Sequence, residues 1–350
     1  MAKIVSIGTA VPPHCVPQDV LREEARIHFG QRLGEINRLL PIFDNVEVRQ
    51  RYFCVPIEWF YQPHSFLDRN DTYIEWAERL SREAIEKCLN KAGVAADEID
   101  HFLFVSTTGM STPSIDAHLI DRMGFDRHIK RTPIFGLGCA GGAAGLGHCL
   151  DLLRTDSAKK VLLVSVEISS LTFQPQDFTK SNLVASALFA DGAAAALVCG
   201  DGCEEEGVQI LDAQSTLYPK TLDVMGWRFT DTGLQVIFSR RIPALVTRFI
   251  RDNIEGFVGR RGLSREDVSH YAIHPGGAKI LTAFENSLDV SPDDLVHSRF
   301  VLENYGNMSS PTVLFVLHHL LESGAPNPGD YGLGAAFGPG FSSELFLLHW

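Results

Sequence analysis

A glycine- and alanine-rich segment around a single cysteine constrains the fold of this chain more than any other feature. An apolar run from Ile134 ends at Gly138, Cys139 follows, and residues 140–148 are mostly glycine or alanine before an amphipathic stretch at 149–154. This order predicts a strand, a tight turn and a helix with one very thin side. We expect that helix to be buried against close neighbours.

Cys139 stands at the expected start of this helix. Unpaired backbone N–H groups and the positive end of the helix dipole would stabilise its thiolate, which is the nucleophilic form. The alternative is a buried structural cysteine, because free cysteine is among the most buried residue types. The C-terminal half of the sequence decides between the two.

Composition limits the class of protein. A chain of 350 residues with 45% hydrophobic content can bury a full core, as one large domain or two similar halves. The net charge of −12 argues against nucleic acid or an anionic membrane as the main partner. No apolar run is long enough to cross a bilayer, and the N-terminus reads as a strand, so we expect a cytoplasmic protein without a membrane span.

The cysteines give no sign of a stapled or metal-bound fold. Seven are scattered along the chain, and no CxxC pair occurs. This usage favours a reducing compartment over a disulfide framework and offers no zinc-ligand spacing, so we predict no metal site.

The second half of the chain echoes the first. An acidic turn leads into a strand and a polar loop at 97–109, and the same order returns at 265–277. Such repetition suggests an internal duplication. We place the boundary at the acidic turn 201–206, which gives an N-terminal half of residues 1–205 and a C-terminal half of residues 206–350.

Strands alternate with helices in each half, which predicts an α/β protein with mostly parallel sheets covered by helices. The main expected elements are a strand at 2–10, a loop at 11–17, a helix at 72–92, strands near 100–109 and 160–167, a helix at 241–258, a helix ending at 321, and strands at 331–337 and 343–350.

Three polar residues fall at comparable places in the two halves. Cys139 follows a strand of the first half, His274 follows the matching strand of the second, and Asn307 precedes a buried helix. Strand ends of α/β folds often converge on one site. Histidine is the usual partner of a cysteine thiolate, and asparagine can donate an N–H group to an oxyanion. Taken alone, His274 also suits a loop or cap and Asn307 a turn.

Four motifs occur in order: Gly138–Gly141, Ile273–Gly277, Asn304–Ser309 and Ala336–Gly340. Together they resemble the type III polyketide synthases, the chalcone synthase-like branch of the thiolase superfamily, over nearly the whole chain. The resemblance implies a thiolase-like fold of two pseudo-duplicated α/β halves in αβαβα layers. Ser-His-Asp triads, P-loops and HExxH motifs are absent.

The resemblance also implies roles for individual residues. Cys139 would accept the acyl group with His274 and Asn307 as partners, and Phe189 would be the gatekeeper between a coenzyme A tunnel and the cavity. Ordinary core packing is the alternative for each cavity position. The implied cavity residues are Thr107, Thr108, Ser169, Leu171, Thr172, Met225, Trp227, Val236 and Ser309.

Two departures from the plant enzymes matter. Their basic cluster for coenzyme A phosphates is nearly uncharged here, which leaves Arg38, Arg51, Gly276 and Gly277 as weak candidates for coenzyme A contacts. Trp227 stands where the plant enzymes have glycine, so the cavity should be narrower there and a bulky aromatic starter should not fit. The segments at 167–173 and 182–189 look more like bacterial alkylpyrone and alkylresorcinol synthases, which take fatty acyl starters.

The function implied by this resemblance is iterative decarboxylative condensation of malonyl-CoA onto an acyl-CoA starter, then closure to a pyrone or resorcinol. Coenzyme A thioesters are then substrates, no cofactor is needed, and a homodimer is implied. Three alternatives stay open. They are a ketoacyl-acyl carrier protein synthase III-like single condensation, a chalcone synthase-like enzyme with an aromatic or malonyl starter, and a non-catalytic thiolase-fold subunit.

Overall fold

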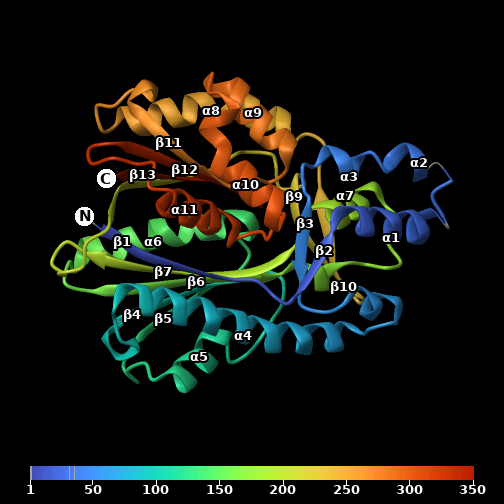
Figure 1. Ribbon diagram of the computed structural model, residues 1–350, viewed down its shortest axis with the longest axis horizontal. Coiled ribbons are helices and arrows are strands. Elements are labelled where there is room, and N and C mark those ends of the chain that lie inside the picture. Colours follow the sequence, from blue (N-terminus) through green and yellow to red (C-terminus); the bar gives the residue numbers. More distant parts are fainter. Residues whose placement is uncertain (1, 31, 35) are drawn as a thin grey trace.

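Layers of helices and strands alternate through the molecule (Figure 1). A computed structural model describes residues 2–30, 32–34 and 36–350. Helices α4 and α5 cover one outer face, α8, α9 and α10 cover the other, and α6 and α11 lie between the two sets of strands. These helices are α4 (Phe66–Ala92), α5 (Ile115–Met123), α6 (Gly141–Thr155), α8 (Ile242–Gly259), α9 (Ala278–Leu288), α10 (Val296–Tyr305) and α11 (Thr312–Glu322).

Nine strands of the described residues pair in the order β11-β12-β13-β8-β1-β7-β6-β4-β5. Within this sheet, β1 pairs with β8 over three residues, which joins the strands that precede residue 201 to those that follow residue 207. The strands are β1 (Ala2–Ala10), β4 (His101–Val105), β5 (Lys130–Ile134), β6 (Lys160–Ile168), β7 (Asp191–Gly200), β8 (Val208–Leu217), β11 (Val268–Ile273), β12 (Tyr331–Gly338) and β13 (Ser342–His349).

The prediction of mostly parallel sheets is wrong. In the nine-stranded sheet of the described residues, β11–β12, β4–β5 and β4–β6 are parallel, and the other five pairings are antiparallel. A parallel pair needs a crossover of a dozen or more residues, whereas β12 and β13 are joined by residues 339–341 alone. The pattern of apolar residues finds buried strands but does not give their direction.

A lobe beyond the layers lies at the right of Figure 1. The predicted loop at 11–17 was wrong in part, because its last four residues form β2, which pairs with β3. None of the described helices is long and apolar enough to cross a membrane. The lobe contains α1 (Gln18–Gly30), α2 (Ile36–Leu39), α3 (Ile42–Asn45), α7 (Lys180–Leu188), β2 (His14–Pro17), β3 (Gln50–Phe53), β9 (Met225–Thr230) and β10 (Gly233–Phe238).

Helix α4 begins at Phe66, six residues before the predicted start at 72. Ser65 caps it, because its hydroxyl accepts a hydrogen bond from Asp68 N at 3.1 Å while the Asp68 carboxylate accepts one from Ser65 N at 3.0 Å. This reciprocal capping satisfies N–H groups that the first turn leaves unpaired. The polar first turn hid the helix from a prediction based on apolar spacing.

The predicted thin-sided helix is confirmed as α6. A Cβ atom built on Gly142 would lie 2.3 Å from the carbonyl oxygen of Ser310, and one on Gly145 would lie 2.5 Å from Leu163 Cδ1. Real side chains do not approach so closely. Position 142 must be glycine for α6 to pack against the main chain at Ser310, whereas a side chain at position 145 would require Leu163 to move. This packing fixes the start of α6, where Cys139 lies.

The Gly142→Ala substitution tests this close approach. The new methyl group must displace main chain, and overpacking of this kind costs about 1–3 kcal/mol of unfolding free energy. Gly256→Ala in α8 is the matched control, because no atom lies within 4 Å of its Cβ position. It should stabilise the protein by about 0.4–1 kcal/mol. Urea unfolding followed by circular dichroism measures both, and equal effects of the two substitutions would contradict the packing argument.

Candidate active site

Cys139 lies in a single 3-10 turn, Gly138–Ala140, that runs directly into α6. The predicted place of the cysteine at a helix N-terminus is therefore confirmed. The side chain is 8% exposed, and its Sγ lies 4.0 Å from Asn307 Oδ1. That Oδ1 atom also accepts a hydrogen bond from Ser309 N at 2.8 Å. Residues 168 positions apart in the chain thus meet at one point.

Asn307 is held by main-chain hydrogen bonds to the end of α7. Its N–H donates to Leu188 O at 2.9 Å, and its carbonyl accepts from Ala190 N at 2.9 Å. Phe189, the predicted gatekeeper, lies between these two partners and forms a parallel bridge with Asn307. The structure therefore brings together the gatekeeper and two of the three predicted catalytic residues.

His274 follows β11 directly, and its N–H donates to Ala335 O of β12 at 2.8 Å. A Cβ built on Gly277, in the same loop, would lie 3.5 Å from Leu188, whose carbonyl also anchors Asn307. Both ring nitrogens of His274 are buried and have no partner among the described residues. A buried polar group without a partner is costly, so this imidazole is suited to a ligand that supplies one.

Burial sets the charge of the site. It raises the pKa of the Cys139 thiol to about 11 and lowers the pKa of His274 to about 3. Burial therefore favours a neutral thiol and a neutral imidazole, and it opposes the thiolate that the helix N-terminus would stabilise. Both shifts arise because a poorly solvated charge is penalised.

A buried carboxylate, which the sequence analysis did not assign to the site, supports the loop before Cys139. Glu167 Oε2 accepts hydrogen bonds from Thr107 N at 2.9 Å, Thr108 N at 2.9 Å and Thr108 Oγ1 at 2.7 Å. Its Oε1 accepts one from Ser310 Oγ at 2.8 Å. Thr107 Oγ1 in turn accepts from Gly138 N at 3.2 Å. Burial raises the Glu167 pKa to about 7, and these donors oppose that rise.

A cavity of about 600 Å³ runs outward from Phe189 between α1 and residues 57–64. Of the predicted cavity residues, Ser169, Thr172, Trp227 and Val236 line it. Much of the remaining wall is apolar or aromatic, with Leu21, Ala25, Ile27, Phe29, Phe53, Phe60 and Phe173. Five predicted cavity residues do not line this space: Thr107, Thr108, Leu171, Met225 and Ser309.

Comparison with known proteins covers almost the whole chain. The N-terminal domain of chalcone and stilbene synthases matches residues 1–202, and their C-terminal domain matches residues 209–350. The chain belongs to the chalcone and stilbene synthase family. It is a type III polyketide synthase, an acyltransferase that condenses malonyl-CoA units.

Three relatives of this type III polyketide synthase show the range of similarity. A provisionally named chalcone synthase of Bacillus subtilis (strain 168) is 43% identical over 100% of this chain and 99% of its own. A 1,3,6,8-tetrahydroxynaphthalene synthase of Streptomyces peucetius subsp. caesius is 36% identical over 99% and 93%. The crystal structure of the Streptomyces coelicolor A3(2) tetrahydroxynaphthalene synthase superposes with a TM-score of 0.95 at 33% identity, over 99% of both chains. The predicted thiolase-like fold is confirmed.

Arg51 of this synthase differs from its predicted use as a coenzyme A contact. The side chain has no exposed surface, and it donates to Phe189 O at 2.9 Å and to Gln18 Oε1 at 2.9 Å. Desolvation lowers its pKa to about 9. The structure therefore disfavours the phosphate contact, and Arg51 instead holds the main chain at Phe189. Arg38 is exposed on α2.

A second aromatic residue beside Phe189 was not predicted from the sequence. The Phe238 ring meets the Phe189 ring edge-on, with centroids 6.5 Å apart, and Trp227 packs at 5.9 Å from Phe189. Phe238 ends β10, whose partner strand β9 carries Trp227. Only the hairpin pairing, which the sequence analysis did not predict, brings these rings together.

The buried neutral imidazole gives a pH prediction. His274 binds a proton near pH 6.5 in the unfolded chain but only near pH 3 in the folded one. Its contribution to stability is therefore present above pH 6.5 and falls by about 1.4 kcal/mol per pH unit below it. Urea unfolding at pH 7.5 and pH 5.0 should show a steeper loss for the wild type than for His274→Gln, by about 2 kcal/mol. His128→Gln, an exposed control, should follow the wild type. Parallel curves for His274→Gln and the wild type would refute the burial argument.

Proposed function

We propose that this enzyme loads a fatty acyl starter from coenzyme A onto Cys139, extends it with malonyl-CoA, and releases a pyrone or resorcinol-type product. The observation that carries the choice of starter is the cavity that runs from Phe189 to the surface, because many apolar and aromatic side chains line it among the polar ones. Its volume of about 600 Å³ suits a long flexible chain, and ligand pockets of about 300–1,000 Å³ are typical of small-molecule sites.

In the first step, the thioester carbonyl approaches Cys139 and supplies the polar partner that His274 lacks. The cysteine proton passes to the imidazole, and the sulfur attacks the carbonyl carbon. The carbon–sulfur bond to coenzyme A then breaks, and the leaving thiolate takes the proton back from His274. The imidazole is neutral at the start and the end of this step, which agrees with its low pKa.

In the second step, malonyl-CoA loses carbon dioxide and leaves an enolate at its thioester oxygen. N–H groups of His274 and Asn307 stabilise that oxygen, because the charge develops where they can donate. Asn307 is suited to this role because its Oδ1 accepts from Ser309 N, which fixes the orientation of the carboxamide. The enolate carbon then attacks the carbonyl carbon of the Cys139 thioester, and Cys139 leaves as a thiolate. The chain, now two carbons longer, is a coenzyme A thioester, and the cysteine sulfur takes it back with release of coenzyme A before the next cycle. A water-poor cavity protects the reactive intermediates.

Two other starters belong to the same chemistry. The tetrahydroxynaphthalene named for the Streptomyces relatives carries no alkyl chain, so a malonyl starter is the second candidate. An aromatic starter is disfavoured, since Trp227 occupies part of the space beside Phe189.

The homodimer expected from the sequence is part of this proposal. Phe135 and Phe229 are each 54% exposed, and their ring centroids lie 6.5 Å apart. Paired exposed aromatic rings are typical of surfaces that meet a partner.

The decisive experiment incubates the wild type and Cys139→Ala with malonyl-CoA and acyl-CoA starters from short to long. We expect pyrones or resorcinols from the fatty starters, identified by mass, and no extended product from Cys139→Ala. Cys149→Ala is the matched control, since Cys149 is also buried but lies within α6. If malonyl-CoA alone gave a naphthalene product, the proposed fatty acyl starter would be wrong and the starter would be malonyl-CoA. A single condensation that requires acyl carrier protein would overturn the iterative mechanism.

Filling the cavity tests where the starter lies. Ala185 lines the cavity from α7, so Ala185→Phe should block long chains and lower kcat/KM for fatty starters at least tenfold, with little effect on short ones. Ala244→Phe, on the exposed face of α8, serves as the control. Equal losses for short and long starters would place the acyl chain elsewhere.

A further inference from the structure

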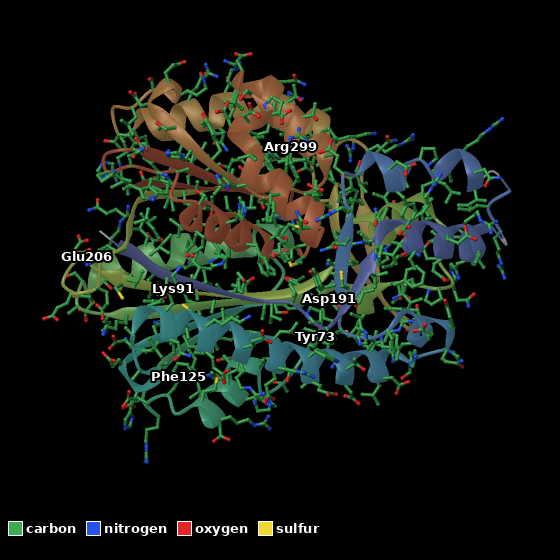
Figure 2. The ribbon with its side chains drawn as sticks, in the orientation of Figure 1. Tyr73, Lys91, Phe125, Asp191, Glu206 and Arg299 are labelled. Atoms are coloured by element: carbon green, nitrogen blue, oxygen red, sulfur yellow. The ribbon has the colours of Figure 1, made fainter. Side chains whose placement is uncertain are left out.

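Two cysteines and a glutamate gather at the end of the molecule opposite the lobe. Cys199 lies near the end of β7, and Cys203 and Glu205 lie in the turn from β7 to β8. The two sulfurs and a carboxylate oxygen all lie within 4.8 Å of one another. Figure 2 labels the next residue, Glu206, at this end, far from Asp191 at the other end of β7. The cluster therefore takes no part in the active site.

Glu205 is held in a way that leaves one oxygen for a ligand. Lys160 Nζ lies 2.7 Å from Glu205 Oε1, and also 2.7 Å from a carboxylate oxygen of Glu98. Glu205 Oε2 is buried and has no partner among the residues that the structure describes. A buried carboxylate oxygen without a donor is costly, and a cation would remove that cost. Lys160 fixes the orientation of the Glu205 carboxylate, and side chains that bind metal ions are commonly oriented in this way by a neighbouring group.

The turn that carries the cluster is already ordered. Cys203 N donates to Gly200 O at 3.1 Å, and Cys203 O accepts from Lys3 Nζ at 2.9 Å. Gly202 N donates to Ser157 O at 2.9 Å, which ties the turn to the chain segment before β6. A preformed turn reduces the ordering that metal binding would otherwise require.

We propose that Cys199, Cys203 and Glu205 bind one zinc ion, with a water molecule as the fourth ligand. Two thiolates and a carboxylate form a soft, anionic donor set of the kind that zinc prefers. Ligand atoms of a tetrahedral zinc site are about 3.5–3.8 Å apart, so the three groups need to close by only about 1 Å. Binding releases the two thiol protons to solvent. Lys160 then balances the remaining negative charge.

This site was not predicted from the sequence, because the cysteines are separated by three residues rather than two. Its role is structural. The ion would fasten the end of β7 to the connection into β8, which is the chain crossing between the halves. It would therefore stabilise the protein without entering the condensation chemistry.

The test uses the full chain, stripped with a chelator under reducing conditions and then titrated with zinc or cobalt. We expect one retained ion per chain, a higher Tm with zinc, and a thiolate-to-cobalt charge-transfer band. Cys203→Ser and Glu205→Gln should each weaken binding at least tenfold, since removing even an outer partner commonly costs 10- to 100-fold. Both side chains are partly exposed, so the variants should fold.

Cys15→Ser is the matched control, because Cys15 is an exposed cysteine outside the cluster. It should bind zinc like the wild type. Equal binding by the wild type and Cys203→Ser, or no retained ion in the wild type, would overturn the proposal. A Cys199–Cys203 disulfide in protein purified without reductant, with no metal bound after reduction, would also overturn it in favour of a redox pair.

Discussion

The rest of the structure depends on the close approach of α6 to its neighbours. Helix α6 contacts strands of both halves and also α11, and glycine at its tightest positions is what permits this. The same condition holds for the turn before it. A Cβ on Gly138 would lie 2.9 Å from Pro339, and one on Gly338 would lie 2.6 Å from Ala140 Cβ. The motif Gly138–Gly141 and the motif Ala336–Gly340 therefore pack against each other.

Buried carboxylates then hold the loops that this packing brings together. Glu167 accepts hydrogen bonds from Thr107 in the loop after β4 and from Ser310 just before α11. Asp191, close to Phe189, also joins two segments. Its carboxylate accepts hydrogen bonds from Cys54 N at 2.8 Å and from Ser170 N at 2.7 Å. Burial raises the pKa of Asp191 to about 6, and the donors oppose that rise. Each acid joins segments far apart in the sequence, so the site is rigid although it is built from loops.

The sequence predicted the features that depend on the local pattern of residues. It did not predict the features that depend on contacts between distant segments. Cys139 at a helix start follows from the glycine spacing around it, whereas His274 and Asn307 became convincing only through resemblance to a family. Strand direction, the burial of Arg51 and the meeting of Phe238 with Phe189 depend on pairings between distant segments. The raised pKa of the Cys139 thiol and the lowered pKa of His274 could not be predicted from the sequence either, because desolvation depends on what the folded chain packs around the two side chains.

The protonation state of Cys139 affects how readily oxidants and alkylating agents damage the enzyme. Oxidants and alkylating agents attack the thiolate rather than the thiol. Burial raises the pKa of the Cys139 thiol to about 11, so the neutral thiol predominates near neutral pH. Burial therefore limits the reaction of Cys139 with such agents, because it disfavours the thiolate that they attack. The packing that excludes water from Cys139 therefore protects the thiol from chemical damage, and it also makes the thiol a weak nucleophile.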